Sequence, residues 1–258
     1  MNKYVPSIEV YGVEAQRFST EAIGLVLNII ADREGNIAAQ THFTKDVYLL
    51  RDSVLYRLSS LGWHIHTICK QHTHIENSFK RDPQGHILIY SNNIQSFSFD
   101  DFIFNLISLY DYYSNLLAYI FIGQNKKQIM WNGFSKACMD KNHPVSKLSF
   151  SSSVATHENE WVKRLQTFRA EVIHYNLNQG KARQKITWKE GEDVEFKIMF
   201  SLPEKLSKKL KLKSPVYENV GIDLQHGVIE IAERSVKWLG EITHSIIMQH
   251  TNHLIKSA

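Results

Sequence analysis

The amino-acid sequence predicts a mainly α-helical protein, a helical bundle to which a small β-hairpin is added. Two long segments repeat apolar residues every three or four positions, as helices do when they bury one face. A third segment, near residue 190, alternates apolar and polar residues on both sides of a glycine, which is typical of a hairpin. With 258 residues, 43% of them hydrophobic, the chain can bury a full core as one large domain or two small ones.

The first forty residues fit two assignments. The stretch EAIGLVLNIIADREGNIAAQTHF is apolar up to Arg33, Glu34 and Gly35. These three residues could turn a strand hairpin, or the glycine could end a helix. We favour strands, so the segment 1–43 is expected to contain β-structure.

A long amphipathic helix is predicted over residues 45–74. Its apolar positions are spaced by three or four residues and share one helical face: Val47, Leu50, Val54, Leu58 and Leu61. The following stretch RDPQGHILIYSNN is rich in Asp, Pro, Gly and Asn and predicts a loop, in which HILIY could form a short strand.

The clearest helix is predicted to begin at Ser98, because Ser98 and Asp101 have the spacing of a capping box. The residues behind it recur at strict four-three spacing: Phe99, Ile103, Leu106, Tyr110, Tyr113, Leu117 and Ile120. Such a seam, held over three heptads, predicts neighbours packed nearly parallel or antiparallel to it, as in four-helix bundles.

A second bundle helix is predicted over 157–178. Ser151, Ser152, Ser153 and Thr156 mark its start, and it ends before Gly180. Its apolar residues again show four-three spacing: Trp161, Leu165, Phe168, Val172 and Tyr175. A hairpin around residues 190–192 and a final helix over about 224–255 complete the chain.

These elements suggest four consecutive segments. An N-terminal segment covers residues 1–43, and the helical core covers 44–180. The β-hairpin and a basic insertion occupy 181–216, and the C-terminal helix, at 217–258, packs on the core.

Positive charge is concentrated in one part of the chain. The net charge is +4, yet residues 147–213 carry 14 Lys and Arg against 8 Asp and Glu, which leaves the rest near −2. Such a field favours a phosphate-bearing partner. The run KLSKKLKLK at 205–213 is more typical of a solvated helix face.

Several classes of protein lack support in the sequence. The first residues have no signal-peptide pattern, and the most apolar stretch, 97–122, is interrupted by acidic and amide residues, so we expect no membrane span. The two cysteines show no CxxC spacing, and a cytoplasmic location is the simplest expectation. No phosphate-binding loop, HExxH or GxSxG motif is present.

Arg169 and His174 lie outside the apolar stripe of their helix. At 100° per residue, Arg169 lies about 75° and His174 about 145° from the centre of the stripe. They offer a cation for a phosphate and an acid/base group that titrates near neutrality.

The segment FRAEVIHYN at 168–176 resembles the Arg-x4-6-His motif of the HEPN superfamily, whose members are helical and often metal-independent ribonucleases. The preceding segment FDDFIFNLISLYDYYSNLLAYIF also looks like a HEPN helix. The resemblance covers roughly residues 45–178 and extends to the last helix, and it implies a HEPN-like helical bundle. One position departs from the family pattern, because Ala170 stands where family nucleases carry Asn, Asp or His.

The resemblance implies a homodimer in which Arg169 and His174 of both protomers form a composite site for RNA cleavage. His174 would act as the general acid or base, and Arg169 would stabilise the charge on the phosphorane. No cofactor or metal is implied. The setting would be a toxin or phage-defence system, with an antitoxin or another defence protein as a partner. Ala170 favours the alternative, a non-catalytic interaction or sensing module.

Two further groups of residues are candidates. Asp111 lies one place off the apolar seam, either as a boundary residue with an ion-pair partner or as a third site residue that reaches Arg169. The histidines of His64-Ile-His66 and His72-Thr-His74 surround Cys69 and suggest a metal site. In a helix, however, residues two apart point about 200° away from one another, so this site would require a loop or a strand.

Overall fold

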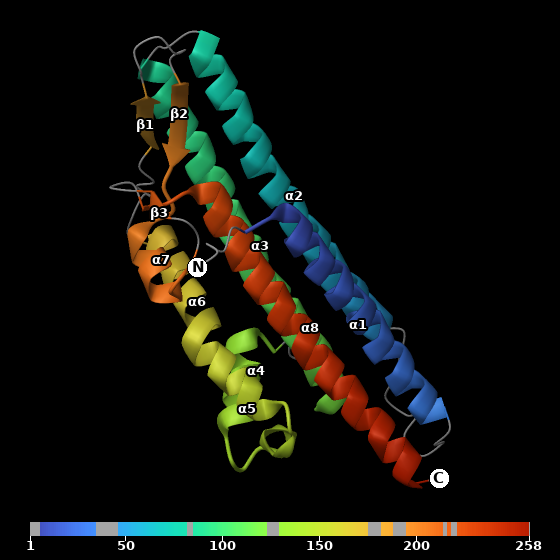
Figure 1. The fold of residues 1–258 in the computed structure, drawn as a ribbon. Coiled ribbons are helices and arrows are strands. Elements are labelled where there is room, and N and C mark those ends of the chain that lie inside the picture. Colours follow the sequence, from blue (N-terminus) through green and yellow to red (C-terminus); the bar gives the residue numbers. More distant parts are fainter. Residues whose placement is uncertain are drawn as a thin grey trace. The chain divides into compact units, whose positions relative to one another are not determined.

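The computed structural model describes residues 6–34, 46–81, 85–122, 129–174, 182–187, 195–213, 216–217 and 221–257. The described chain is mainly helical, as predicted (Figure 1). The long helices are α1 (Ile8–Glu34), α2 (Asp46–Arg81), α3 (Gly85–Phe121) and α8 (Leu224–Ser257). The shorter helical elements are α4 (Trp131–Met139), a 3₁₀ turn (Pro144–Lys147), α5 (Ser151–His157), a π-helical segment (Glu158–Val162), α6 (Lys163–His174) and α7 (Glu204–Leu210).

The chain divides into two compact units, each of which collects stretches far apart in the sequence. Unit 1 consists of Met1–Tyr11, Leu61–Asn105 and Arg164–Ala232. Unit 2 consists of Gly12–Ser60, Leu106–Lys163 and Glu233–Ala258. The sequence predicts consecutive segments, because hydrophobic periodicity detects single elements and not their grouping.

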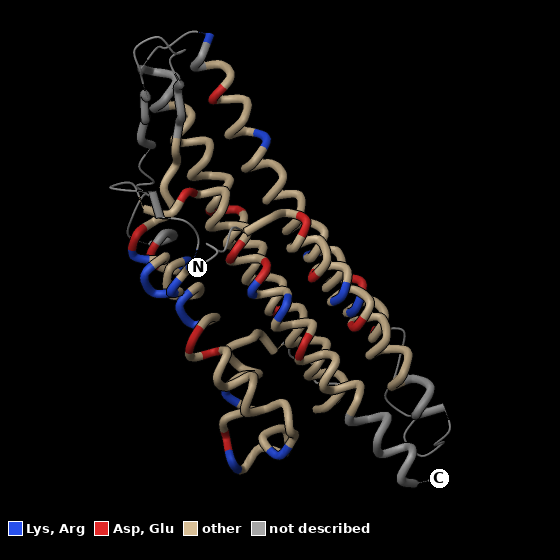
Figure 2. The backbone as a smooth tube through the Cα atoms, in the orientation of Figure 1, with Lys and Arg blue, Asp and Glu red and all other residues tan. Residues whose placement is uncertain are grey.

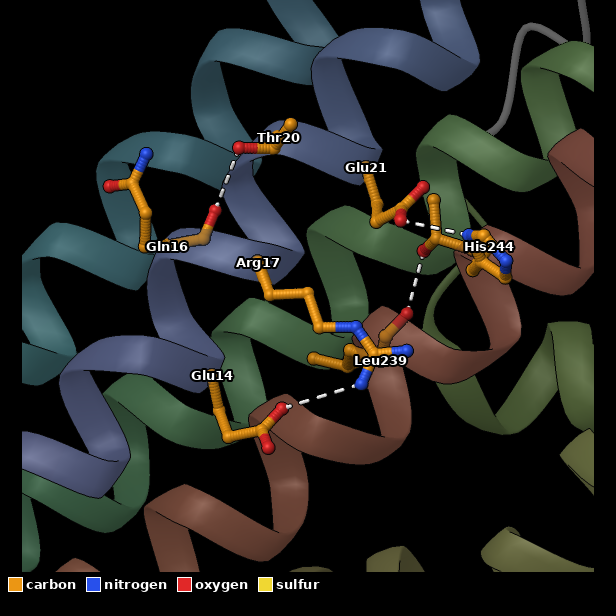
Figure 3. A network of polar contacts seen from close by, with 8 residues as sticks. Glu14, Gln16, Arg17, Thr20, Glu21, Leu239 and His244 are labelled. Carbon is orange, nitrogen blue, oxygen red and sulfur yellow. Dashed lines mark hydrogen bonds and ion pairs between the residues drawn. The ribbon is translucent and has the colours of Figure 1, made fainter.

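Unit 2 contains a packed helical bundle. The ring of Phe18 on α1 meets that of Tyr113 on α3 with 5.7 Å between centroids, and the Tyr113 hydroxyl lies 2.9 Å from Thr243 Oγ1 on α8. Figure 3 shows the contact between α8 and α1, where His244 Nδ1 lies 2.9 Å from Glu21 Oε1. Aromatic packing, one buried hydrogen bond and one exposed polar contact therefore join three of its helices.

The strands expected near the N-terminus were wrong. Residues Ile8–Glu34 form one helix, whose buried residues include Phe18, Ala22, Leu25, Val26 and Ile29. This spacing is helical, but the apolar run that contains it is also compatible with a strand. Residues 35–43, the remainder of the predicted segment, lie outside the described residues.

The periodicity of the second and third helices is confirmed, but their connection is not. Four of the predicted residues of α2 are buried and the fifth, Leu50, is half-buried; the buried ones are Val47, Val54, Leu58 and Leu61. All seven predicted seam residues of α3 are buried. The predicted loop and strand were wrong from Gly85 onward, because α3 already begins there.

The proposed capping box at Ser98 was also wrong, since this residue lies inside α3. Its hydroxyl donates to Gln71 Oε1 on α2 at 2.9 Å. One turn earlier, Gln95 Nε2 donates to the Ile68 carbonyl at 3.2 Å. Ser98, which suggested a helix start, therefore hydrogen-bonds a neighbouring helix of unit 1, as Gln95 also does.

Short antiparallel strands pair within unit 1. Strand β1 (Ala182–Thr187) pairs with β2 (Glu195–Phe200), from Ala182 opposite Phe200 to Thr187 opposite Glu195. The predicted turn at 190–192 lies outside the described residues. Strand β3 (Val216–Tyr217) pairs with β4 (Gly221–Ile222), directly before α8.

Within the described residues, every helix is too short or too polar to cross a lipid bilayer.

Candidate functional site

Helix α6 positions Arg169 by burying the residues before it. Leu165 and Phe168 are buried, and the Phe168 ring lies 5.9 Å from the Phe99 ring on α3, measured between centroids. This contact fixes the rotation of α6 about its axis. Arg169, the next residue, is consequently half-buried at the edge of the packed face.

The guanidinium of Arg169 rests on an aromatic ring. Its Cζ atom lies 4.4 Å from the centroid of Phe104 on α3. Its Nε is buried and has no hydrogen-bond partner among the described residues. Among these residues, no carboxylate forms an ion pair with this side chain either. A buried donor without an acceptor carries a free-energy cost, and the contact with Phe104 stabilises the guanidinium at this edge of the packed face.

The acidic residue nearest along α6 is already paired elsewhere. Glu171 Oε2 lies 2.7 Å from Lys205 Nζ, and Glu171 Oε1 lies 3.6 Å from Lys209 Nζ. The hydrogen bond from Lys205 lowers the pKa of Glu171, with Lys209 contributing further. Glu171 therefore forms its ion pairs with α7 and not with Arg169.

The basic run at 205–213 forms an amphipathic helix followed by a turn. Leu206 and Leu210 of α7 are buried, whereas Lys205 and Lys208 are exposed. Arg164 on α6 donates to the carbonyl of Lys209. Figure 2 shows the Lys and Arg residues gathered along α6 and α7. The solvated face expected from the sequence is thus combined with ion pairs to α6.

His174 is the last residue of α6, five positions beyond Arg169, and its side chain lies outside the described residues. An α-helix separates two such positions by about 140° around its axis and about 7.5 Å along it. Ala170, between them, is exposed and supplies no polar group.

Asp111 acts at a helix N-terminus. Its Oδ1 accepts a hydrogen bond from the backbone N–H of Trp131, the first residue of α4, at 2.9 Å. This interaction satisfies a donor that has no acceptor within the helix. Asp111 belongs to unit 2 and Arg169 to unit 1. The hydrogen bond to Trp131 accounts for the polar side chain at position 111 without a role as a third site residue.

The histidine pairs around Cys69 lie on the continuous helix α2, where two residues of a pair face different sides. Among the described residues, no three His, Cys, Asp or Glu side chains are grouped closely enough to hold a metal ion. Burial, with a smaller effect of Asp223, raises the pKa of the Cys69 thiol to about 11. A protonated thiol is a poor metal ligand.

Sequence reasoning missed a polar cluster in the core of unit 2. The ring of His157 stacks on Trp238 with 3.8 Å between centroids and 2° between planes, and its Nε2 lies 2.8 Å from the Tyr110 hydroxyl. Burial, assisted by the positive charge of Arg234, lowers the pKa of His157 to about 3. The imidazole is therefore neutral at physiological pH.

The π-helical segment after His157 belongs to the same cluster. Glu158 is only 6% exposed, and its Oε2 accepts a hydrogen bond from Trp131 Nε1 at 2.6 Å. Trp161 Nε1 donates to Ser235 Oγ at 2.9 Å. The partners lie tens of residues apart in the sequence. Their aromatic character is therefore the only sequence signal that could have suggested this site. Its groups satisfy one another, which indicates a structural role.

Comparison with family models, curated proteins and solved structures found no match to this chain.

Proposed function

We propose that this protein is a metal-independent endoribonuclease of the HEPN type that acts as a homodimer, in a cytoplasmic toxin or phage-defence setting. The observation that carries the proposal is Arg169: a half-buried guanidinium, oriented by Phe104, for which the described residues provide no anionic partner. Such a group suits the phosphate of a nucleic acid. An antitoxin or another defence protein is the expected partner.

Helix geometry supports a site shared between two protomers. Positions 169 and 174 lie about 140° apart around α6, and we propose that a second copy of the chain brings the two groups to one phosphate. When two copies meet, Arg169 of one protomer can lie opposite His174 of its partner. This arrangement is the composite site that the resemblance to HEPN proteins implies.

The reaction then follows from the two groups. A neutral His174 takes the proton of a ribose 2′-hydroxyl, whose oxygen attacks the adjacent phosphorus. Arg169 stabilises the negative charge that develops on the phosphorane. The bond to the 5′-oxygen breaks, and protonated histidine returns a proton to that oxygen, leaving a 2′,3′-cyclic phosphate and a 5′-hydroxyl.

A non-catalytic interaction or sensing module is the second candidate. The observation in its favour is Ala170, which is exposed beside Arg169 and leaves the site without a polar group that the family nucleases carry.

Cleavage of single-stranded RNA in the presence of EDTA separates the two candidates. We expect the wild-type protein to cut, and both Arg169→Ala and His174→Ala to cut at least about 100-fold more slowly, as when one transition-state donor is lost. Lys208→Ala, which removes an exposed lysine of the same unit, is the matched control and should cut normally. Absence of cleavage by the wild-type protein, or unchanged cleavage by both site variants, would reject the nuclease.

A further inference from the structure

The second half of helix α2 exposes a face that contains no acidic residue. All exposed side chains between residues 61 and 78 lie on this face, here called the α2 polar face: Trp63, His66, Lys70, Thr73, His74 and Asn77. Their spacing of three and four residues aligns them along one side of the helix, over about 20 Å. All of them belong to unit 1.

Trp63 is an unusual residue for a solvent-facing position. Its side chain is 63% exposed, and its ring meets that of His64 edge-on, with 5.1 Å between centroids. A ligand that covers this ring would remove a large apolar area from water. The indole face is therefore available for stacking.

The rest of the face is hollowed. An open hollow of about 450 Å³ lies over His66, Cys69, Lys70, Thr73, His74 and Asn77. The side chains of His66, Lys70, His74 and Asn77 can donate hydrogen bonds, and Lys70 adds a positive charge, whereas the Thr73 hydroxyl already donates to the Cys69 carbonyl. A protein partner would be expected to meet more than one large apolar side chain in such an area. A polyanion that also carries flat rings matches the face better.

We infer that the α2 polar face binds single-stranded RNA, with one base stacked on Trp63 and the backbone phosphates over Lys70 and its polar neighbours. Bases of a duplex are already stacked on one another, so an exposed indole selects an unpaired base. This inference rests on the proposed function, for which it supplies the surface that holds the substrate.

Binding can be measured without cleavage. The probe is a short fluorescein-labelled 2′-O-methyl oligouridine, which lacks the attacking hydroxyl, and fluorescence anisotropy reports its affinity for the full chain. We expect Trp63→Ala to weaken binding roughly tenfold and Trp63→Phe to restore most of it, since stacking on one ring has about this effect. Phe97→Ala removes a ring that is 62% exposed on α3 and is the matched control, expected to bind normally.

Salt dependence tests the charged part of the face. Between about 50 and 200 mM salt, the logarithm of the wild-type affinity should fall linearly with the logarithm of the salt concentration, and Lys70→Gln should reduce that slope by a little under one unit. A duplex of the same length should bind with no dependence on Trp63.

The outcomes also distinguish this inference from the nuclease. If the wild-type protein cuts RNA while neither Trp63→Ala nor Lys70→Gln changes the affinity, the α2 polar face is rejected and the proposed function remains. If oligouridine binds through Trp63 but no RNA is cut, the nuclease is rejected and the binding face remains. Failure of the wild-type protein to bind at low salt would overturn the inference.

Discussion

Arg169 retains a partly buried charge by resting on Phe104 in place of a carboxylate. The sequence could predict its position at the edge of the packed face, because that follows from 100° of rotation per residue. It could not predict Phe104 as its partner, or the pairing of Glu171 with two lysines of α7, because these contacts depend on elements brought together by the fold. The His157 cluster could not be predicted from the sequence for the same reason.

His157 predicts a specific loss of stability in acid. Its pKa is about 3 in the folded state and about 6.5 in an unfolded chain, so between these values the unfolded state binds more protons. Its contribution to the free energy of unfolding is fully present above pH 6.5 and is lost as the pH falls toward 3. Urea unfolding at pH 7 and pH 5 should show a decrease of about 2 kcal/mol from this group.

The variant His157→Gln separates this effect from the other groups that titrate. It is expected to be less stable than the wild-type protein at pH 7, because the stacking on Trp238 is lost. Its stability should nevertheless change less between pH 7 and pH 5. An equal decrease in both proteins would show that His157 is not a buried neutral imidazole.

At the scale of elements, periodicity predicted the helices that bury a continuous apolar face and failed where polar residues decide the boundary. The seam of α3 and the buried residues of α6 were predictable for this reason. The stretch from Gly85 to Ser98 was not, because Gln95 Nε2 and the Ser98 hydroxyl donate hydrogen bonds to α2 within unit 1. The local composition favours a loop in this stretch, but hydrogen bonds to α2 stabilise a helix.

Asp111 offers a test of an element boundary. Because its carboxylate accepts from the N–H of Trp131, Asp111→Ala should lower the free energy of unfolding by about 1 kcal/mol, whereas Asp111→Asn, which can still accept this hydrogen bond, should lose much less. Thermal or urea unfolding measures the difference. RNA cleavage per folded molecule should be unchanged in Asp111→Asn, and a 100-fold decrease would instead make Asp111 part of the site.

For the whole molecule, the sequence indicated a mainly helical chain. It did not indicate the two units, each of which combines stretches far apart in the sequence. Helix periods describe one element at a time, and the grouping of distant stretches into a unit depends on contacts between them. Each site proposed above lies within unit 1, as do the ion pairs between α6 and α7. The nuclease site proposed above combines Arg169 of one copy of the chain with His174 of a second copy.

The most direct test of the account is cleavage of an RNA that carries one 2′-deoxyribose at the site of cutting, in EDTA. If His174 activates the 2′-hydroxyl and Arg169 holds the phosphate, the substituted RNA should resist cleavage at that site, while the unmodified RNA should yield a 2′,3′-cyclic phosphate end. Equal cleavage of both RNAs at that position would contradict the mechanism.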